Sequence, residues 1–272
     1  MLARVALVVV VALGACAPNR IDEARSALRT NDLPTARALL EAERERHPKS
    51  VPARLELGEV YYRSARDALD WDDDEGTYLA YLEKAVDEFV QAAALDPKNP
   101  QPLFYLAMID MYRGDLPAAQ RGFRNTNRLG FGAIGDTNLA ESYVYAGDLE
   151  AASRLNLSGQ LRGAGMAPVT FNEMLIAWRA GDLAAARRSF ELLRVQYPDA
   201  VRTINVAPLP TTPKTFEEFA GYCCASPACG PYLEEACAAL SKPVKHREIS
   251  AETVRRELQL EMEKQRRLKE IY

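Results

Sequence analysis

The chain has 272 residues, a formal net charge of −4 and five cysteines. Residues 1–15 contain Arg4 and no acidic residue, so the chain without them carries a net charge of about −5. This mild acidity gives no reason to expect nucleic-acid binding, which needs a basic surface. The length is sufficient for one large core or for one elongated array.

The first residues have the layout of a secretory signal peptide. Arg4 precedes an apolar run from Val5 to Leu13, and small residues lead from there to Cys16. The run is shorter than the roughly 20 apolar residues that a transmembrane helix needs. The stretch LGAC that ends at Cys16 resembles the lipobox of bacterial lipoproteins, with Gly14 where Ala, Ser or Thr is usual.

That resemblance implies removal of residues 1–15 and lipidation of Cys16. Several acyl chains hold a protein stably on a membrane. Ala17 stands where an Asp would retain an enterobacterial lipoprotein at the inner membrane, so we expect a lipid anchor in the cell outer membrane, facing the periplasm. Residues 16–20 are then the lipidated cysteine and a tether with a reach of about 15 Å, which holds the folded part close to the membrane.

Residues 21–200 are expected to form a series of helical hairpins. The turn GDLxxA occurs at 114–119, 147–152 and 181–186, and its glycines are 33 and 34 residues apart. A glycine at this place permits the turn that ends one helix, and the following Asp can cap the next helix. A constant period of this length is typical of helical repeats.

The packing residues between these turns point to a particular repeat. Ala85, Phe89 and Pro97 have the spacing expected in a second helix, and Gly58 and Tyr61 have that of a first helix. Small residues let two helices approach, aromatic residues fill the space between neighbours, and the Pro ends the helix. These residues resemble those of tetratricopeptide (TPR) repeats. The resemblance implies an all-α, TPR-like solenoid of about five helical hairpins.

Two units depart from the pattern. The fourth has Asn156 where the aromatic residue belongs and Gly159 in its second helix, so its packing should differ. In the second, 27 residues separate Gly58 from Ala85. The usual separation is about 12 residues, so we expect an acidic insertion at about 64–78 between the two helices. Such an insertion is either a loop that binds a partner or a cation, or a merely solvated one.

The acidic run DWDDDEG within this insertion partly resembles a calcium-binding loop. Asp70, Asp72 and Asp74 have the spacing of EF-hand ligands. However, Glu75 stands where the turn glycine belongs, and Tyr81 stands where the bidentate Glu belongs. The sequence therefore does not predict a specific calcium site, and we expect no metal.

The TPR resemblance also implies which side chains line the concave face of the array. They are rich in aromatic residues and Met, which suits a groove for an amphipathic helix or an extended peptide. Alternatively, the chain's own linker or final helix covers them. The predicted groove residues are Leu55, Tyr62, Phe104, Met108, Met111, Tyr112, Tyr145, Phe171, Leu175 and Trp178.

Three segments follow the repeats. Residues 201–214 contain three prolines and are expected to be a linker. Residues 215–241 are expected to form a Cys-rich, disulfide-clamped helical hairpin, and residues 242–272 a charged C-terminal helix. This helix should either cap the array or bind a partner. Its narrow apolar stripe consists of Val254, Leu258 and Met262.

Lipidation of Cys16 leaves Cys223, Cys224, Cys229 and Cys237. Their spacing contains no C-x2-C pair, which argues against a zinc knuckle and against thiol–disulfide catalysis. An even number of cysteines in an oxidising compartment instead favours two structural disulfides. We expect the adjacent Cys223 and Cys224 to pair with Cys229 and Cys237, and the connectivity stays open.

We see no assembled acid, base and nucleophile, and no Gly-rich phosphate loop, so we expect no enzymatic activity and no cofactor. The function predicted is that of a lipid-anchored TPR adaptor that binds an envelope protein. Secretin or pilus assembly, outer-membrane protein assembly, motility and peptidoglycan machinery are the processes that such lipoproteins serve. The alternative is a periplasmic lipid- or glycan-binding structural lipoprotein whose groove is covered by its own C-terminus.

Overall fold

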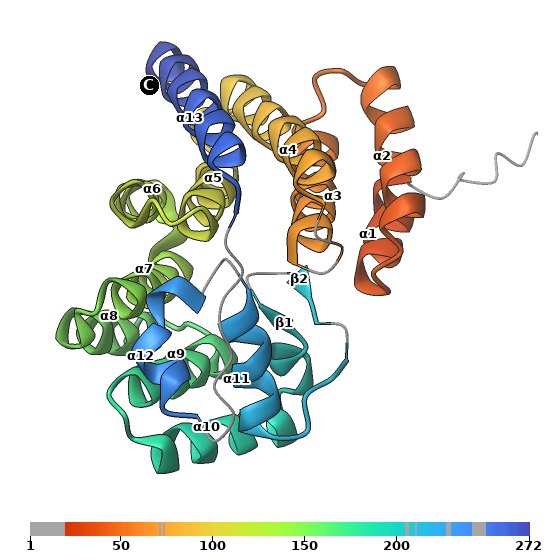
Figure 1. The fold of residues 1–272 in the computed structure, drawn as a ribbon. Helices are drawn as coiled ribbons and strands as arrows, with labels where there is room; N and C mark the ends of the chain where they lie inside the picture. The colour runs from red at the N-terminus through yellow and green to blue at the C-terminus, as the bar shows by residue number, and fades with distance from the viewer. Residues whose placement is uncertain are drawn as a thin grey trace, which may run out of the picture.

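A computed structural model describes residues 20–70, 72, 74–204, 207–209, 211–226, 230–240 and 249–272 (Figure 1). Over these residues the predicted all-α fold is confirmed. The one addition is a two-residue antiparallel pair, β1 (Thr203–Ile204) and β2 (Ala207–Pro208), within the predicted linker. The predicted signal peptide and the lipidated Cys16 lie outside the described residues. Among the described helices, none has the length and apolar character needed to span a bilayer.

The first ten helices form five consecutive pairs, and each pair contacts the next one along the chain. Figure 1 shows α1 and α2 at one end of the molecule and α9 and α10 at the other end of the series. The helices are α1 (Arg20–Arg29), α2 (Leu33–Arg46), α3 (Val51–Asp70), α4 (Glu75–Leu95), α5 (Pro100–Tyr112), α6 (Leu116–Thr126), α7 (Gly132–Ala146), α8 (Leu149–Leu161), α9 (Met166–Arg179) and α10 (Leu183–Gln196).

The repeated GDL turn has the predicted geometry. Gly114, Gly147 and Gly181 adopt φ angles of 82°, 84° and 81°, a left-handed conformation that glycine reaches without strain. The Asp after each glycine caps the following helix, because its carboxylate accepts a hydrogen bond from the backbone N–H three residues on. The equivalent first turn uses Asn31, at φ 59°, and Asp32 in the same way.

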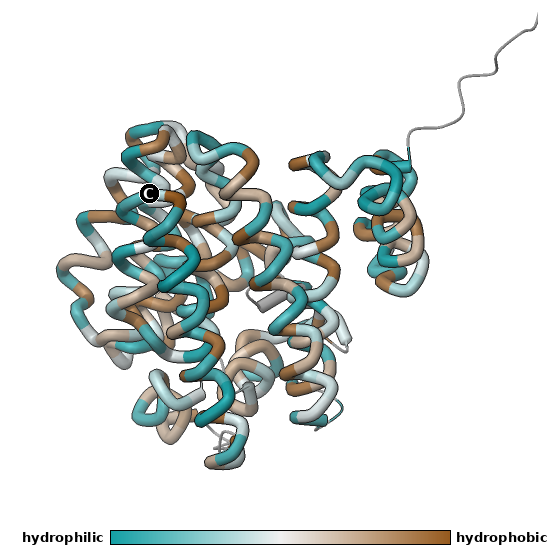
Figure 2. The backbone as a smooth tube through the Cα atoms, turned by 90° about the horizontal axis from the view of Figure 1, so that it is seen from above, coloured by the Kyte–Doolittle hydropathy of each residue, from teal (hydrophilic) through white to brown (hydrophobic). Residues whose placement is uncertain are grey.

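The packing between the two helices of a pair also follows the predicted residues. A Cβ added at Gly58 would lie 2.6 Å from the Phe89 ring, so only glycine allows α3 and α4 to approach this closely. Phe89 and Phe123 are fully buried, and Phe190 is nearly so. Burial of a Phe side chain stabilises the fold by about 1.5–3 kcal/mol. Figure 2 shows hydrophobic and hydrophilic residues interspersed along the helices, as expected when each helix buries one face.

The extra residues of the second pair do not form the loop that the sequence predicted. They lengthen both helices instead: α3 has 20 residues and α4 has 21, against 13 and 11 in α5 and α6. The reason lies in the residues after the acidic run, where Tyr78, Leu79 and Leu82 are buried at helical spacing. Asp74 caps α4 by accepting from Thr77 N–H at 2.9 Å. The first turns of the longer α4 contact the C-terminal helix.

The fourth pair packs through hydrogen bonds where the other pairs use an aromatic ring. Asn156 is buried, and its amide donates to the Val169 carbonyl at 3.0 Å. Its Oδ1 accepts from the Asn172 amide, also at 3.0 Å. Gly159 lies close to α7, since an added Cβ would be 2.8 Å from Thr137 Cγ2. Asn156 thus joins α8 to α9 of the next pair, whereas Gly159 permits the close contact between α7 and α8.

Shorter elements complete the described chain. A π-helical turn, η1 (Asn127–Phe131), joins α6 to α7, and a 3-10 turn, η2 (Pro198–Val201), follows α10. The C-terminal part contains α11 (Phe216–Ala225), η3 (Gly230–Tyr232), the five-residue α12 (Glu234–Ala238) and the long α13 (Ala251–Ile271). One hydrophobic cluster runs from α1 to Leu240, so α11 and α12 share the core of the helical pairs.

Candidate binding surface

The predicted groove residues are mostly not on the surface. Eight of the ten are buried, with exposed fractions of 7% or less, and Phe104 and Phe171 are half-buried. The prediction of an accessible groove therefore has to be corrected for this structure, because the chain itself covers these side chains. The eight are Leu55, Tyr62, Met108, Met111, Tyr112, Tyr145, Leu175 and Trp178.

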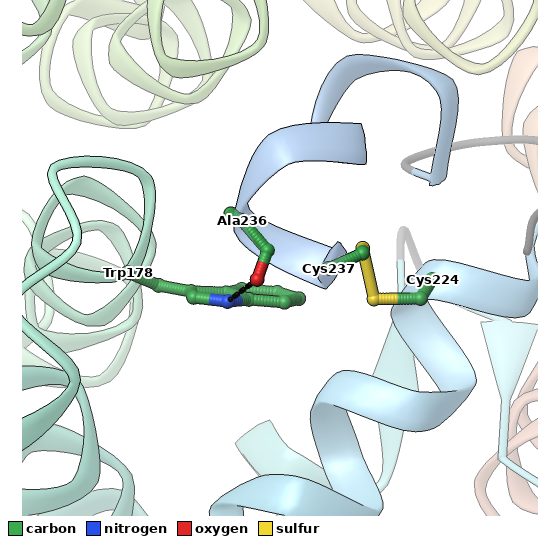
Figure 3. Close-up of a disulfide and its surroundings, with 4 residues drawn as sticks. All are labelled: Trp178, Cys224, Ala236 and Cys237. Atoms are coloured by element: carbon green, nitrogen blue, oxygen red, sulfur yellow. Dashed lines mark hydrogen bonds between the residues drawn. A yellow bond between two sulfur atoms is a disulfide. The ribbon is translucent and has the colours of Figure 1, made fainter. Parts of the chain in front are cut away.

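The elements α11, η3 and α12 cover the side chains from α7 and α9. Trp178 meets the ring of Phe216 edge-on at 5.4 Å, and its indole N–H donates to the Ala236 carbonyl at 3.1 Å (Figure 3). Phe171 contacts Phe219 in the same edge-on manner at 5.8 Å. An indole N–H that is buried needs such an acceptor, so this hydrogen bond fixes where α12 lies.

Towards α3 and α5 the covered surface contains buried charges. Arg66 donates to Asp70 at 2.9 Å, and its guanidinium lies 4.0 Å above the ring centroid of Tyr112. The Tyr112 hydroxyl donates to the other carboxylate oxygen of Asp70 at 3.0 Å. Ser226, at the end of α11, contributes a further hydrogen bond to that same oxygen at 3.2 Å. The C-terminal part thus completes a polar cluster that begins on α3.

A second buried carboxyl lies on α7. Glu141 accepts a hydrogen bond from the Tyr145 hydroxyl at 2.9 Å. Burial raises the pKa of Glu141 to about 7, although the Tyr145 hydrogen bond and the Arg66 charge act in the opposite direction. A carboxyl with such a pKa can exchange a proton near neutral pH. Its described partners are a phenol and a distant guanidinium, which do not make up a set of catalytic groups.

One of the predicted disulfides is confirmed. Cys224 of α11 and Cys237 of α12 are bonded, with their Cα atoms 5.9 Å apart (Figure 3). Cys223 is also disulfide-bonded, while the predicted sites Cys16 and Cys229 lie outside the described residues. The Cys224–Cys237 bond ties α12 to α11 directly beside Trp178, so it supports the segment that covers the predicted groove.

The C-terminal helix α13 lies against α4 and α5 with its polar side towards them. Its apolar stripe faces solvent: Val254, Leu258 and Met262 are 40%, 57% and 67% exposed. Its buried face instead carries Glu257 and Lys264. The stripe takes no part in the contact of α13 with the helix pairs, because α4 and α5 present polar side chains at this place.

The polar contacts under α13 form one connected group. The Tyr78 hydroxyl donates to Glu257, and Arg113 pairs with Glu261 at 3.0 Å. Lys264 pairs with Glu261 at 2.6 Å and also with Asp110 of α5. Burial raises the pKa of Asp110, and Lys264 opposes that rise. All of these groups have charged or hydrogen-bonding partners, as buried polar groups must.

The start of α13 is held by the lengthened α4. Glu75 accepts from the Ser250 backbone N–H at 2.9 Å and from the Ser250 hydroxyl at 2.5 Å. The Thr253 hydroxyl donates to the same carboxylate. The acidic segment of the sequence therefore has structural partners. Asp70 binds Arg66, Asp74 caps α4 and Glu75 holds α13, so these side chains do not converge on one cation.

The comparisons and a search for metal ligands give no further assignment. Among the described residues, no group of three or more His, Cys, Asp or Glu side chains is arranged to hold a metal ion. No protein-family model matches the chain, and no curated protein matches it either. Assignment of a role therefore depends on the sequence patterns and on the surfaces that the structure leaves free.

The sequence contains no local signal for the polar contacts of α13. A helix with many Lys, Arg and Glu residues usually presents them to solvent, so Glu257, Glu261 and Lys264 carry no signal of burial in the sequence. Their partners Tyr78, Asp110 and Arg113 lie about 150 or more positions earlier. No local pattern connects residues that far apart.

Proposed function

We propose that the protein is a non-enzymatic, lipid-anchored adaptor of the TPR type, which holds an envelope protein at the periplasmic side of the outer membrane. The five consecutive helix pairs, taken as TPR-like units, form the scaffold. Support comes from the three GDL turns at a constant period and from the Gly58–Phe89 contact, which is the close approach that a TPR unit needs between its helices. The lipobox-like stretch ending at Cys16 supplies the anchor in this proposal.

The observation that carries the proposal is that successive helix pairs contact each other in chain order. In a repeat protein each unit contacts its neighbours, and the extended surface that results is suited to binding another protein. Since α11, η3 and α12 cover the predicted groove residues of α7 and α9, and most of the others are buried, the partner binds elsewhere on the scaffold. Candidate surfaces include exposed apolar side chains on α8, α10 and α13, such as Leu161, Val195 and Met262.

The alternative is a structural lipoprotein whose groove holds a lipid or glycan. The first part of that alternative is a groove covered by the chain's own C-terminal part. The second part, a bound lipid or glycan, has less support, because Phe216, Phe219 and Ala236 contact the groove residues Phe171 and Trp178 where such a ligand would lie. The adaptor is therefore the function that the observations favour.

The proposal can be tested by two experiments, both in cells that produce the protein. Metabolic labelling with a palmitate analogue should mark the wild type and not Cys16→Ser, and the wild type should fractionate with the outer membrane. Crosslinking of the full chain in intact cells, followed by mass spectrometry, should recover an envelope protein. Recovery of nothing above the background of an unrelated outer-membrane lipoprotein would reject the adaptor role.

A further inference from the structure

A cleft of about 600 Å³ lies between α6 and α13, with α5 at its base. Leu103, Leu106 and Ala107 of α5 contribute its apolar floor. The other lining residues are Pro97, Asp110, Ala118, Arg121, Gly122, Asn125, Arg128, Leu129, Lys264, Gln265, Leu268, Lys269 and Tyr272. We call it the α6–α13 cleft.

Small residues explain why the cleft is hollow. A Cβ added at Gly122 would lie 2.6 Å from the Cβ of Ala107, so α5 and α6 approach closely and no side chain fills the space above them. On the other side, the ion pair of Lys264 with Asp110 holds α13 down on α5. Both of these residues are less than 5% exposed, so the inner wall of the cleft is built from buried, paired groups.

The rim of the cleft is basic. Arg121, Arg128 and Lys269 are exposed, whereas the one acidic side chain in the lining, Asp110, is already paired with Lys264. Neither Arg121 nor Lys269 forms an ion pair with a residue in the described part of the chain. An apolar floor with unneutralised cations around it is complementary to a ligand that is apolar on one side and acidic at its edges.

Beyond the cleft, the surface of α13 carries polar and charged side chains together with Met262. Gln265 and Lys269 line both the cleft and a shallow depression that includes Met262. From Met262 the exposed stripe runs back through Leu258 to Val254. A helix of 21 residues is about 30 Å long, so this surface is longer than a single acyl chain or a small ligand requires.

Exposure of this stripe is unusual, because a surface helix normally turns its apolar side inwards. Here the buried ion pairs of Glu257, Glu261 and Lys264 hold the helix in the opposite orientation. A row of exposed apolar side chains beside an apolar cleft typically marks an interaction surface. Helix-in-groove recognition uses apolar anchors at i, i+3 or i+4, and i+7, which such a surface can accept.

We propose that the α6–α13 cleft and the stripe of Val254, Leu258 and Met262 bind an acidic amphipathic helical segment of the partner protein. This inference rests on the adaptor function and specifies its binding surface. The apolar side chains of the segment occupy the cleft above Leu103 and Leu106. Its carboxylates pair with Arg121 and Lys269 at the two rims.

Site-specific photo-crosslinking of the full chain in living cells tests the inference. A photo-reactive phenylalanine is introduced at Gln265, which lies on the rim, and the crosslinked peptide is sequenced. The expected product is a segment with apolar residues at helical spacing and an excess of Asp and Glu. The charge-reversal variant Arg121→Glu/Lys269→Glu should lower the crosslink yield by about tenfold.

A matched control separates the cleft from a general charge effect. Arg188→Glu/Lys49→Glu makes the same change in net charge at two exposed positions away from the cleft, and it should leave the yield within about twofold. An equal loss in both variants would overturn the assignment to the cleft. A crosslink to lipid, to a second copy of this chain, or to a segment without acidic excess would also overturn it.

A second set of positions distinguishes failure of this inference from failure of the adaptor function. Photo-reactive residues at Leu157 of α8 and at Val195 of α10 sample other exposed apolar sites. A protein partner found there and not at Gln265 leaves the adaptor function intact and rejects the cleft. No protein partner at any of the three positions rejects both.

Discussion

Lys264 of α13 and Asp110 of α5 form an ion pair in the interior of the protein, although 154 positions separate them in the sequence. Both side chains are almost completely buried. Glu261 and Arg113 extend the pair into a connected group between α13 and the helical repeats. This contact, rather than an apolar seam, fixes the orientation of the last helix.

Removal of Lys264 should therefore be costly. Lys264→Met keeps an unbranched side chain but leaves Asp110 as a buried carboxyl without its main charge partner. Loss of one member of a buried pair destabilises a protein by about 3–5 kcal/mol. We expect a decrease of that size in the free energy of unfolding, measured by urea denaturation of residues 16–272 with Cys16→Ser.

The double variant Lys264→Met/Asp110→Leu is the control for this prediction. Replacement of both charges by apolar groups is often nearly neutral, so the double variant should recover most of the lost stability. If it is as unstable as the sum of the two single variants, Lys264 and Asp110 are not coupled.

Glu141 should make stability depend on pH. Burial raises the pKa of this carboxyl from 4.5 to about 7 in the folded protein. Because the folded state binds the proton more tightly than the unfolded state, its contribution to stability is fully present below pH 4.5. That contribution is lost as the pH rises to about 7, and the total loss is about 3 kcal/mol.

Comparison with Glu141→Gln isolates this contribution from those of Asp110 and the other carboxyls. The amide is neutral at every pH and can still accept from the Tyr145 hydroxyl. Unfolding free energies should be measured between pH 5 and pH 8. As the pH rises, the stability of the variant should increase relative to that of the wild type. Parallel curves for the two proteins would mean that Glu141 titrates normally.

The local features of this fold could be predicted from the sequence because each depends on a few adjacent residues. Gly114 and Asp115 determine a helix end and the next helix start by backbone conformation and capping, and both occur as predicted. The Gly58–Phe89 contact followed from residue size in the same way. The Cys224–Cys237 bond lay among the few pairings that four clustered cysteines allow.

The features that could not be predicted from the sequence depend on residues far apart in the chain. Whether Trp178 lines an open groove is decided by Phe216 and Ala236, which come after the linker. The orientation of α13 is decided by Tyr78 and Asp110. Periodicity identifies the apolar face of a helix, and it does not report that the opposite face meets buried charges.

A substitution at Gly58 should destabilise the second helix pair. In Gly58→Ala the new Cβ would lie 2.6 Å from the ring of Phe89, so the ring or the helices must move. Overpacking of this kind costs about 1–3 kcal/mol, and urea denaturation should show it as a lower midpoint.

Gly221 of α11 provides the matched comparison. No atom lies within 4 Å of a Cβ added there, so Gly221→Ala should have no steric cost. The higher helix propensity of alanine should stabilise this variant by up to about 1 kcal/mol. The close approach of α3 and α4 would be in doubt if both alanine variants shifted the midpoint in the same direction.

Loss of the Cys224–Cys237 bond should loosen the cover over Trp178. The bond closes a loop of 13 residues, and removal of a disulfide with a loop of this length costs about 3 kcal/mol. Without it, packing and the Trp178–Ala236 hydrogen bond still hold α12 beside α9, but α12 loses its covalent tie to Cys224. In a Trp71→Phe background, where Trp178 is the remaining tryptophan, Cys224→Ser/Cys237→Ser should shift the fluorescence to longer wavelength and speed quenching by acrylamide. A matched loss of stability from Gly58→Ala should not expose the indole, because α3 and α4 lie outside its contacts. An indole that stays equally protected in the serine variant would show that α12 covers Trp178 without help from the disulfide.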